Sequence, residues 1–184
     1  WADERGVITM REFDVALLSE AVYDMALHCC YILPDDFKAA LRAARDAEDS
    51  EQGRHTLDII LTNLELSEQM QYPACQDTGM CVVWLEVGRE VHFNADPYGA
   101  VQDGVRRAYK DGYLRKSVVG DPLRRTNTGD NTPAMVTTRI VAGDRVKVVY
   151  AAKGFGSENA SQLKMLRAES LQKRPVPGNL CYIL

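Results

Sequence analysis

The sequence predicts an α+β fold in which N-terminal helices are followed by a mixed, largely antiparallel sheet with a further helix. Apolar residues recur at helical spacing through residues 10–71, and apolar and polar residues alternate in several segments of residues 72–166. With 184 residues and 46% hydrophobic composition, the chain can bury a core. We therefore expect one domain over residues 1–184, ending in an irregular tail at residues 167–184.

Three amphipathic segments predict the helices of the lead-in. EFDVALLSEAVYDMALHC, residues 12–29, is followed by Pro34, and DDFKAALRAARDAED, residues 35–49, opens on an Asp that can cap a helix. The third segment is GRHTLDIILTNLELSEQM, residues 53–70. The side chains expected to face inward are Phe13, Leu17, Val22, Met25, Ala26, Leu57, Ile60, Leu61 and Leu64.

The sheet is expected from two pairs of strands with a helix between them. CVVWLEVGREVHF, residues 81–93, is typical of a hairpin-like pair around Gly88 and Arg89. DPYGAVQDGVRRAYKDGYL, residues 96–114, predicts a helix that ends near Gly112. AMVTTRIVAGDRVKVVYAA, residues 134–152, predicts two alternating strands around a turn at residues 142–144.

Charge and composition exclude several classes of function. The net charge is −4 and basic residues are interleaved with acidic ones, so we expect no nucleic-acid partner. No apolar run approaches the roughly 18 to 20 residues that cross a bilayer, and the N-terminus lacks a signal-peptide pattern, so we expect no membrane span and a cytoplasmic location. An odd count of five cysteines favours thiols over a disulfide framework.

Three loops rich in polar residues and glycine lie next to predicted strands. They are PACQDTG (residues 73–79), RRTNTGDNTPA (residues 124–134) and AAKGFGSENAS (residues 151–161). Each can be a simple turn, since Asp, Asn, Thr and Gly form turns, but together they favour a site. The third loop lacks both the GxGxxG and the GK[ST] pattern, so we set a nucleotide site aside.

The cysteines differ in their surroundings. Cys75 and Cys81 are not spaced as a zinc knuckle, and Cys81, like Cys29 and Cys30, is expected to be a small buried apolar residue. Cys75 has polar neighbours and could be a nucleophile or a metal ligand. A nucleophile needs a histidine base, and no motif surrounds any of the three histidines, which are His28, His55 and His92.

Three segments in order resemble a known family. PACQDTGMCVVWLEVGREVHF, DGVRRAYKDGYLRKSVVGDPLRRTNTGDNTPAMV and KGFGSENASQLKML are similar to the alpha subunit or N-terminal domain of iron–sulfur hydro-lyases, the class I fumarase and L-tartrate dehydratase type. The resemblance covers residues 10–166. It implies reversible hydration of a small dicarboxylate, fumarate with malate or tartrate with oxaloacetate. It also implies a beta subunit or C-terminal domain as partner and a homodimer of the alpha part.

The resemblance also implies roles for individual residues. Cys75 would ligate a 4Fe-4S cluster. Gln76 and Asp77 would bind or act on substrate, with Asp77 moving a proton or, in the alternative, capping its loop. Arg115 would hold a substrate carboxylate or, in the alternative, form a surface salt bridge. Gly156 would contribute backbone contacts to the substrate.

The end of the sequence departs from the family pattern. The family needs two further cysteines, one of them in an NxCPP-like motif, whereas Cys181 is not followed by proline and comes too soon after the third loop. We therefore expect Cys181 not to be the second ligand and the chain to be truncated or to lack segments. A non-catalytic, partner-binding remnant without a cluster is the alternative function.

Overall fold

The computed structural model describes residues 10–156 and residue 165. The chain divides into two units, residues 1–154 and residues 155–184, and each is described by itself. Of the second unit, the structure describes only Phe155, Gly156 and Met165, all of which are exposed. The expected single domain over residues 1–184 stays a prediction.

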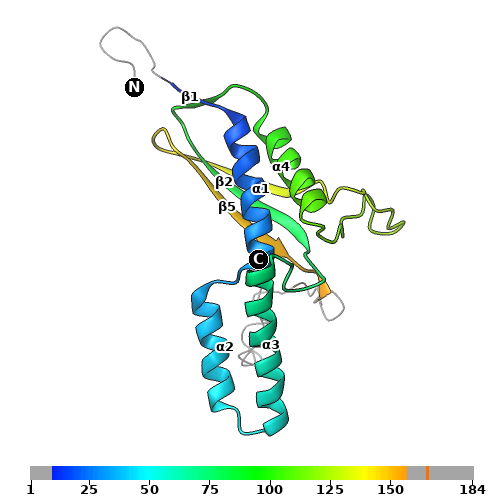
Figure 1. The fold of residues 1–184 in the computed structure, drawn as a ribbon. Coiled ribbons are helices and arrows are strands. Elements are labelled where there is room, and N and C mark those ends of the chain that lie inside the picture. The colour runs from blue at the N-terminus through cyan, green and yellow to red at the C-terminus, as the bar shows by residue number, and fades with distance from the viewer. Residues whose placement is uncertain (1–9, 157–164, 166–184) are drawn as a thin grey trace. The chain divides into compact units, whose positions relative to one another are not determined.

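The first unit contains four helices and five strands within its described residues. The helices are α1 (Val15–Tyr31), α2 (Asp35–Ala47), α3 (Glu51–Met70) and α4 (Pro97–Asp111). The strands are β1 (Arg11–Phe13), β2 (Met80–Gly88), β3 (Val91–Phe93), β4 (Met135–Val141) and β5 (Val146–Lys153). Figure 1 shows α1 and α4 side by side against the sheet, and α2 and α3 as a separate helical pair. The predicted α+β class with a mixed sheet is confirmed.

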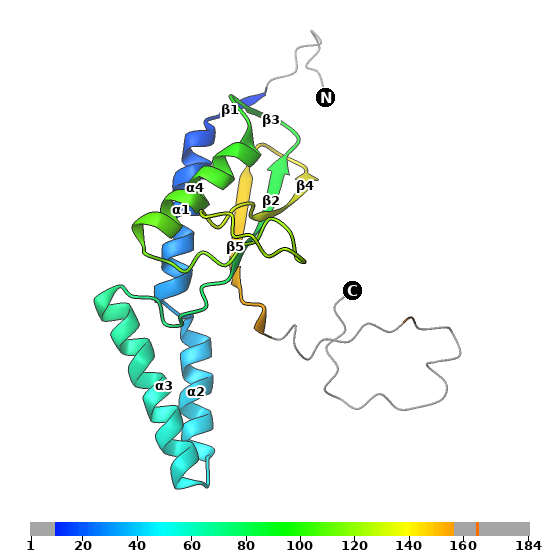
Figure 2. The ribbon, with the colours of Figure 1, turned by 90° about the vertical axis from the view of Figure 1, so that its right-hand side faces the viewer.

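The strands do not form the two expected hairpins. β2 lies at the centre of a three-stranded sheet of order β4-β2-β5, parallel to β4 and antiparallel to β5 (Figure 2). β3 pairs instead with β1, in parallel, and the rings of Phe13 and Phe93 meet edge to face at 5.5 Å. One ladder of the larger sheet is therefore parallel and the other antiparallel.

Gly88 explains why β4 and β5 flank β2 rather than pairing with each other. The amide of Gly88 donates to Arg145 O at 2.7 Å, and that of Glu90 donates to Gly143 O at 3.1 Å. The turn between β4 and β5 thus passes over the end of β2. A Cβ at Gly88 would lie 2.2 Å from Gly143 O, so only glycine permits this crossing. The glycine expected to turn a hairpin instead accommodates a neighbouring turn.

Helices α1 and α4 form the main helical contact over the sheet. Gly104 on α4 faces the backbone of Ser19 on α1, and a Cβ at Gly104 would lie 2.4 Å from Ser19 O. The core between these helices and the sheet is fully enclosed; its least exposed members include Leu18, Val22, Val83, Leu85, Val101, Val105 and Tyr109. Burial of such side chains is worth roughly 1.5 to 3 kcal/mol each, which makes this contact the basis of the unit.

The inward faces of the lead-in helices were predicted in part. Val22, Ala26 and Leu64 are buried, whereas Leu17 is 62% and Ile60 39% exposed. Leu18 occupies the core position expected for Leu17, because α1 turns a slightly different face toward α4. The cap residue of α2 is Pro34, without a side-chain hydrogen bond, so the expected Asp cap is wrong. Asp35 and Asp36 lie in the first turn, where carboxylates favour the helix dipole.

The stretch Val15–Ala47 is long and apolar enough to cross a membrane by length and composition, although no membrane span was expected. Core helices of soluble proteins pass the same test. The stretch consists of α1 and α2, which have 17 and 13 residues. Each is shorter than the roughly 20 residues that span a bilayer.

Gly104→Ala should destabilise the first unit. The new Cβ would meet a backbone oxygen that can yield only if α1 shifts. Overpacking costs typically about 1 to 3 kcal/mol and outweighs a gain in helix propensity of about 1 kcal/mol. We expect urea unfolding to show a net loss of about 1 kcal/mol or more.

Gly53→Ala in α3 is the matched control, since its Cβ would meet only the flexible side chain of Glu48. It should leave the free energy of unfolding unchanged or raise it by up to about 1 kcal/mol. Equal effects of the two substitutions would contradict the close contact at Gly104.

Candidate functional site

The Cys75 loop, residues 73–79, connects α3 to β2. Its entry is fixed by two bonds, in which the amide of Ala74 donates to Cys30 O at 3.0 Å and Asn63 Nδ2 donates to Ala74 O at 2.8 Å. Cys75 and Gln76 are exposed, and Asp77 is half-buried. The thiol and the amide of the predicted site are therefore presented to solvent from an anchored loop.

Asp77 caps the loop from within. Its Oδ1 accepts a hydrogen bond from the amide of Gly79 at 3.1 Å. Gly79 has φ +68, and a Cβ there would lie 2.4 Å from Lys153 O, so the loop packs directly on the end of β5. The capping contact expected as the alternative is thus present. It uses one lone pair of the carboxylate, and the proton-transfer role of Asp77 stays a prediction.

Arg115 belongs to a second segment, residues 113–118, which follows α4 and touches the Cys75 loop. Thr78 Oγ1 donates to Arg115 O at 3.0 Å. The Arg115 side chain is exposed, and within residues 10–156 it forms no ion pair. The surface salt bridge expected as the alternative is therefore not found in the described part of the chain.

Asn131 connects both segments and was not singled out from the sequence. Its side chain is fully buried, with Oδ1 accepting from the amides of Ser117 at 2.7 Å and Val118 at 3.2 Å. Its Nδ2 donates to Gly79 O at 3.2 Å. Asn131 belongs to the second polar loop, and its amide joins the first polar loop, at Gly79, to the segment that carries Arg115. No local signal distinguishes Asn131 from Asn127, four residues earlier in the same turn-rich loop.

Tyrosine side chains close the buried side of the site. Tyr109 on α4 donates its hydroxyl to Thr78 O at 2.8 Å, with Gly79 O at 3.2 Å, and Tyr150 lies 2.9 Å from Cys81 Sγ. Desolvation raises the pKa of both tyrosines, and it raises the pKa of Cys30 to about 12. The buried groups are therefore neutral, and the expectation that Cys30 and Cys81 are buried is confirmed, whereas Cys29 is exposed.

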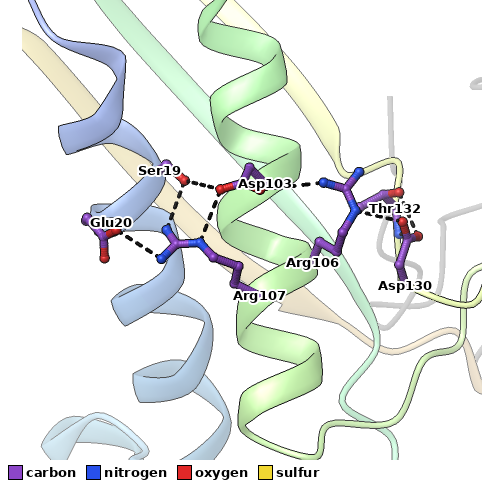
Figure 3. Close-up of polar contacts among 7 residues, drawn as sticks. All are labelled: Ser19, Glu20, Asp103, Arg106, Arg107, Asp130 and Thr132. Carbon is purple, nitrogen blue, oxygen red and sulfur yellow. Dashed lines mark hydrogen bonds and ion pairs between the residues drawn. The ribbon is translucent and has the colours of Figure 1, made fainter.

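A chain of ionic contacts ties α1 and α4 to the loop before Asn131 (Figure 3). Arg107 bonds both Asp103 and Ser19, and Arg106 Nε donates to Asp130 Oδ2 at 3.0 Å. Asp130 Oδ1 also accepts from the hydroxyl of Thr132 at 2.7 Å and from its amide at 3.0 Å. The Thr132 bonds, with Arg106 adding less, lower the pKa of Asp130 to about 2. The residue next to Asn131 is thereby held against α4.

An apolar groove borders Cys75. It has a volume of about 470 Å³, and its lining residues come from the start of α2, the middle of α3 and the Cys75 loop. They are Leu33, Phe37, Ile59, Ile60, Asn63, Leu64, Ala74 and Cys75. The one polar lining side chain, Asn63, is already bonded to Ala74 O. The groove thus gives the exposed thiol an apolar wall.

The described residues include one thiol, that of Cys75, which is expected to ligate an iron–sulfur cluster. Cys75 is an exposed loop thiol, as a ligand requires, but among residues 10–156 and 165 no group of three or more His, Cys, Asp or Glu side chains could hold a metal ion. Cys181 lies outside the described residues, as do residues 157–161 of the third polar loop. Gly156 lies in the second unit, so its contact with substrate stays a prediction.

Comparisons with known proteins agree with these motifs. Residues 19–175 match the family described as fumarate hydratase (Fumerase). A Methanocaldococcus jannaschii protein with the provisional name L(+)-tartrate dehydratase subunit alpha is 35% identical over 157 residues, which cover 82% of this chain and 55% of that protein. The L(+)-tartrate dehydratase subunit alpha of Escherichia coli is 30% identical over 142 residues, covering 74% and 46%.

A fumarate hydratase is similarly related. The aerobic class I enzyme of Escherichia coli is 33% identical over 121 residues, which cover 65% of this chain and 22% of that protein. The chain thus spans about half the length of the tartrate dehydratase relatives and about a fifth of the fumarate hydratase.

Asp130 makes the free energy of unfolding fall at low pH, and Thr132→Val should reduce this loss. A carboxyl group whose folded-state pKa is depressed stabilises the fold above its unfolded pKa, near 3.9, and this contribution is lost as pH falls toward the folded value of about 2. The Asp130 side chain is 30% exposed, so we expect the contribution to be about 1 kcal/mol. Urea unfolding between pH 4.5 and 2 should show a smaller loss in the variant than in the native chain.

Thr137→Val on the exposed face of β4 is the control, because it makes the same chemical change away from Asp130. It should keep the native pH dependence. If the free energy of unfolding of Thr132→Val also fell with pH as steeply as that of the native chain, the assignment of these bonds to Asp130 would be contradicted.

Proposed function

The chain belongs to the family of class I fumarate hydratases and L(+)-tartrate dehydratase alpha subunits, and we propose that it is the alpha-type part of a hydro-lyase acting on a small 2-hydroxy dicarboxylate. The reaction would interconvert fumarate and malate, or tartrate and oxaloacetate. The observation that supports the proposal most directly is the bond from Thr78 to Arg115 O, which joins the loop of the candidate thiol ligand to the segment of the candidate carboxylate-binding arginine.

Each proposed site residue has its own chemical role. Removing water from such a substrate requires loss of a hydroxyl group, removal of a proton from the adjacent carbon, and cations that hold two carboxylates. Arg115 is exposed and can offer paired N–H donors to one carboxylate. Asp77 takes or relays the proton, and the Gln76 amide binds the substrate beside it. Gly156 adds backbone contacts in this proposal.

Cys75 is proposed to hold one corner of a 4Fe-4S cluster. When bound, such a cluster supplies a Lewis-acidic iron for the substrate hydroxyl. The other thiolate ligands are expected from outside the described residues. The apolar groove beside Cys75 would limit access of water to a bound cluster.

A second polypeptide or domain completes the proposed enzyme. Two relatives are named as alpha subunits, which supports a beta subunit as partner. The second substrate carboxylate would be held by that partner. A homodimer of the alpha part is also part of the proposal.

The substrate class and the enzyme role can be tested together. The assembled enzyme, reconstituted anaerobically with iron and sulfide, should be brown, bleach in oxygen and contain about four irons per chain. It should convert fumarate or tartrate. Iron without activity on either substrate would contradict the substrate class, and a colourless protein would support the alternative of a non-catalytic, partner-binding chain.

Cys75→Ser should lower the iron content of the reconstituted enzyme. A hydroxyl is a poor ligand for iron in such clusters, which thiolates hold. Because Cys75 is exposed on a loop, the melting temperature of the chain before reconstitution should stay unchanged. Iron and sulfide analysis provides the measurement.

Cys29→Ser is the matched control, since Cys29 is the other exposed thiol within residues 10–156. Its iron content should equal that of the native enzyme. The ligand assignment would be wrong if Cys75→Ser also retained full iron.

Arg115→Lys should lower kcat/KM by about two or more powers of ten, equivalent to about 3 kcal/mol. Lysine keeps the positive charge but loses the paired donors that match a carboxylate. Iron content and melting temperature should change little, because the Arg115 side chain is exposed and its backbone oxygen still accepts from Thr78.

Arg124→Lys offers the same change on an exposed arginine of the next loop and should leave the kinetics near native values. Near-native kinetics in Arg115→Lys would remove Arg115 from the substrate site and leave Gln76 and Asp77 as the proposed contacts.

A further inference from the structure

The side chain of Asn131 makes three hydrogen bonds to two segments that share no strand pairing. Its Oδ1 accepts from Ser117 and Val118, in the Arg115 segment, and its Nδ2 donates to Gly79 O, in the Cys75 loop. Within residues 10–156, one other side-chain hydrogen bond joins these segments directly, the one from Thr78 to Arg115 O. The Asn131 side chain therefore supplies most of the direct links between the two segments, while Tyr109 holds the Cys75 loop to α4.

Helix α4 holds the backbone on both sides of Asn131. Arg106 bonds Asp130, the residue before it, and Gln102 Oε1 accepts from the amide of Ala134 at 2.7 Å. The backbone of Asn131 itself has φ 62, a left-handed conformation that asparagine tolerates better than most residues. The Asn131 side chain is thus held on a rigid support, which a residue that fixes the distance between two segments requires.

We propose that Asn131 is a positioning residue, whose side chain sets the Arg115 segment against the Cys75 loop so that the substrate anchor and the cluster ligand face one site. The proposal rests on the proposed function for its consequence in catalysis, but the coupling of the two segments can be measured without it. Asparagine is suited to this role because its amide offers a donor and an acceptor in one plane.

An aspartate at this position provides a reversible test. A neutral carboxyl group has one donor and one acceptor and can reproduce all three bonds, whereas the ionised group only accepts and would repel Gly79 O. Burial disfavours the ionised form and raises the pKa of a carboxyl group. In Asn131→Asp the coupling should therefore be native-like at low pH and be lost as pH rises.

The titratable groups around Asn131 do not obscure this test. Cys81 Sγ lies 4.0 Å from Asn131 Nδ2, and Tyr109 shares Gly79 O as acceptor. Desolvation raises the pKa of Cys81 and of Tyr109, so both are neutral below pH 8. The pKa of Asp130 is held at about 2, mainly by Thr132, and this group stays charged. Tyr150, beside Cys81, also has a raised pKa.

Hydrogen exchange of the chain before reconstitution measures the coupling directly. After correction for the intrinsic pH dependence, the amide of Gly79 in Asn131→Asp should exchange at a near-native rate at pH 5.5 and at least about tenfold faster at pH 8. The amides of Ser117 and Val118 should stay protected, because an ionised carboxylate still accepts their hydrogen bonds. The amides of β2 should also stay protected. Asn94→Asp is the control, since Asn94 is exposed and its side chain bonds Asp14 and the amide of Val15, away from both segments. It should show native rates at both pH values.

Kinetics of the assembled enzyme provide the second readout. The kcat/KM of Asn131→Asp for fumarate or tartrate, divided by that of the native enzyme at the same pH, should fall at least about tenfold between pH 5.5 and pH 8. Both enzymes are assayed below the melting temperature of the variant. A uniformly destabilised protein would not recover at low pH. If the native enzyme were inactive, the proposed function would be contradicted. Hydrogen exchange alone would then decide the role of Asn131.

Parallel exchange profiles in Asn131→Asp and the native chain would overturn the inference even if the enzyme is active. Should Asn131→Asp fail to fold, Asn131→Gly removes the side chain and keeps the left-handed backbone accessible. Both segments should then exchange at least about tenfold faster at every pH, and unchanged protection of either segment would again overturn the inference.

Discussion

The contact of α1 with α4 at Gly104 is the constraint on which the rest of the first unit depends. Because Gly104 has no side chain, α4 can lie directly against the backbone of Ser19. From that position α4 directs Tyr109 to the Cys75 loop and Arg106 to the loop that carries Asp130. A helix displaced by the width of a methyl group could not make both sets of contacts at native hydrogen-bond lengths.

The candidate site is held by neutral hydrogen bonds on its buried side and by ionic contacts at its edge. Asn131, Tyr109 and Tyr150 are buried and bonded mainly to backbone oxygens, amides or a thiol, which avoids the cost of enclosing charge. The charged groups Arg107 and Asp130 lie nearer the solvent. This separation leaves the side chain of Arg115 exposed to solvent.

The sequence predicts the elements of this fold better than their partners. Periodic apolar residues identify the four helices and the strands β2 to β5, and Gly112 marks the end of α4 as expected. They do not identify β1, whose residues 12 and 13 were expected to begin the first helix. The pairing of β4 and β5 with β2 was not predictable, because Gly88 is as compatible with a hairpin turn as with the crossing that occurs there. Cys75 was singled out from its polar neighbours and Arg115 from the family resemblance, and the roles of both stay predictions. Asn131 was missed because its importance comes from its burial and from contacts 13 and 52 residues away.

The central place of β2 also determines the order in which the molecule can assemble. Val82 pairs with Met135 on one side and with Ala151 on the other, so the sheet has high contact order. The α2–α3 pair needs only local interactions. Both ladders, by contrast, require closure of long loops, with an entropic cost that precedes any gain from pairing. During synthesis the Cys75 loop leaves the ribosome well before the end of β5, on which Gly79 packs. The loop can therefore take its final conformation only after the last ladder has closed.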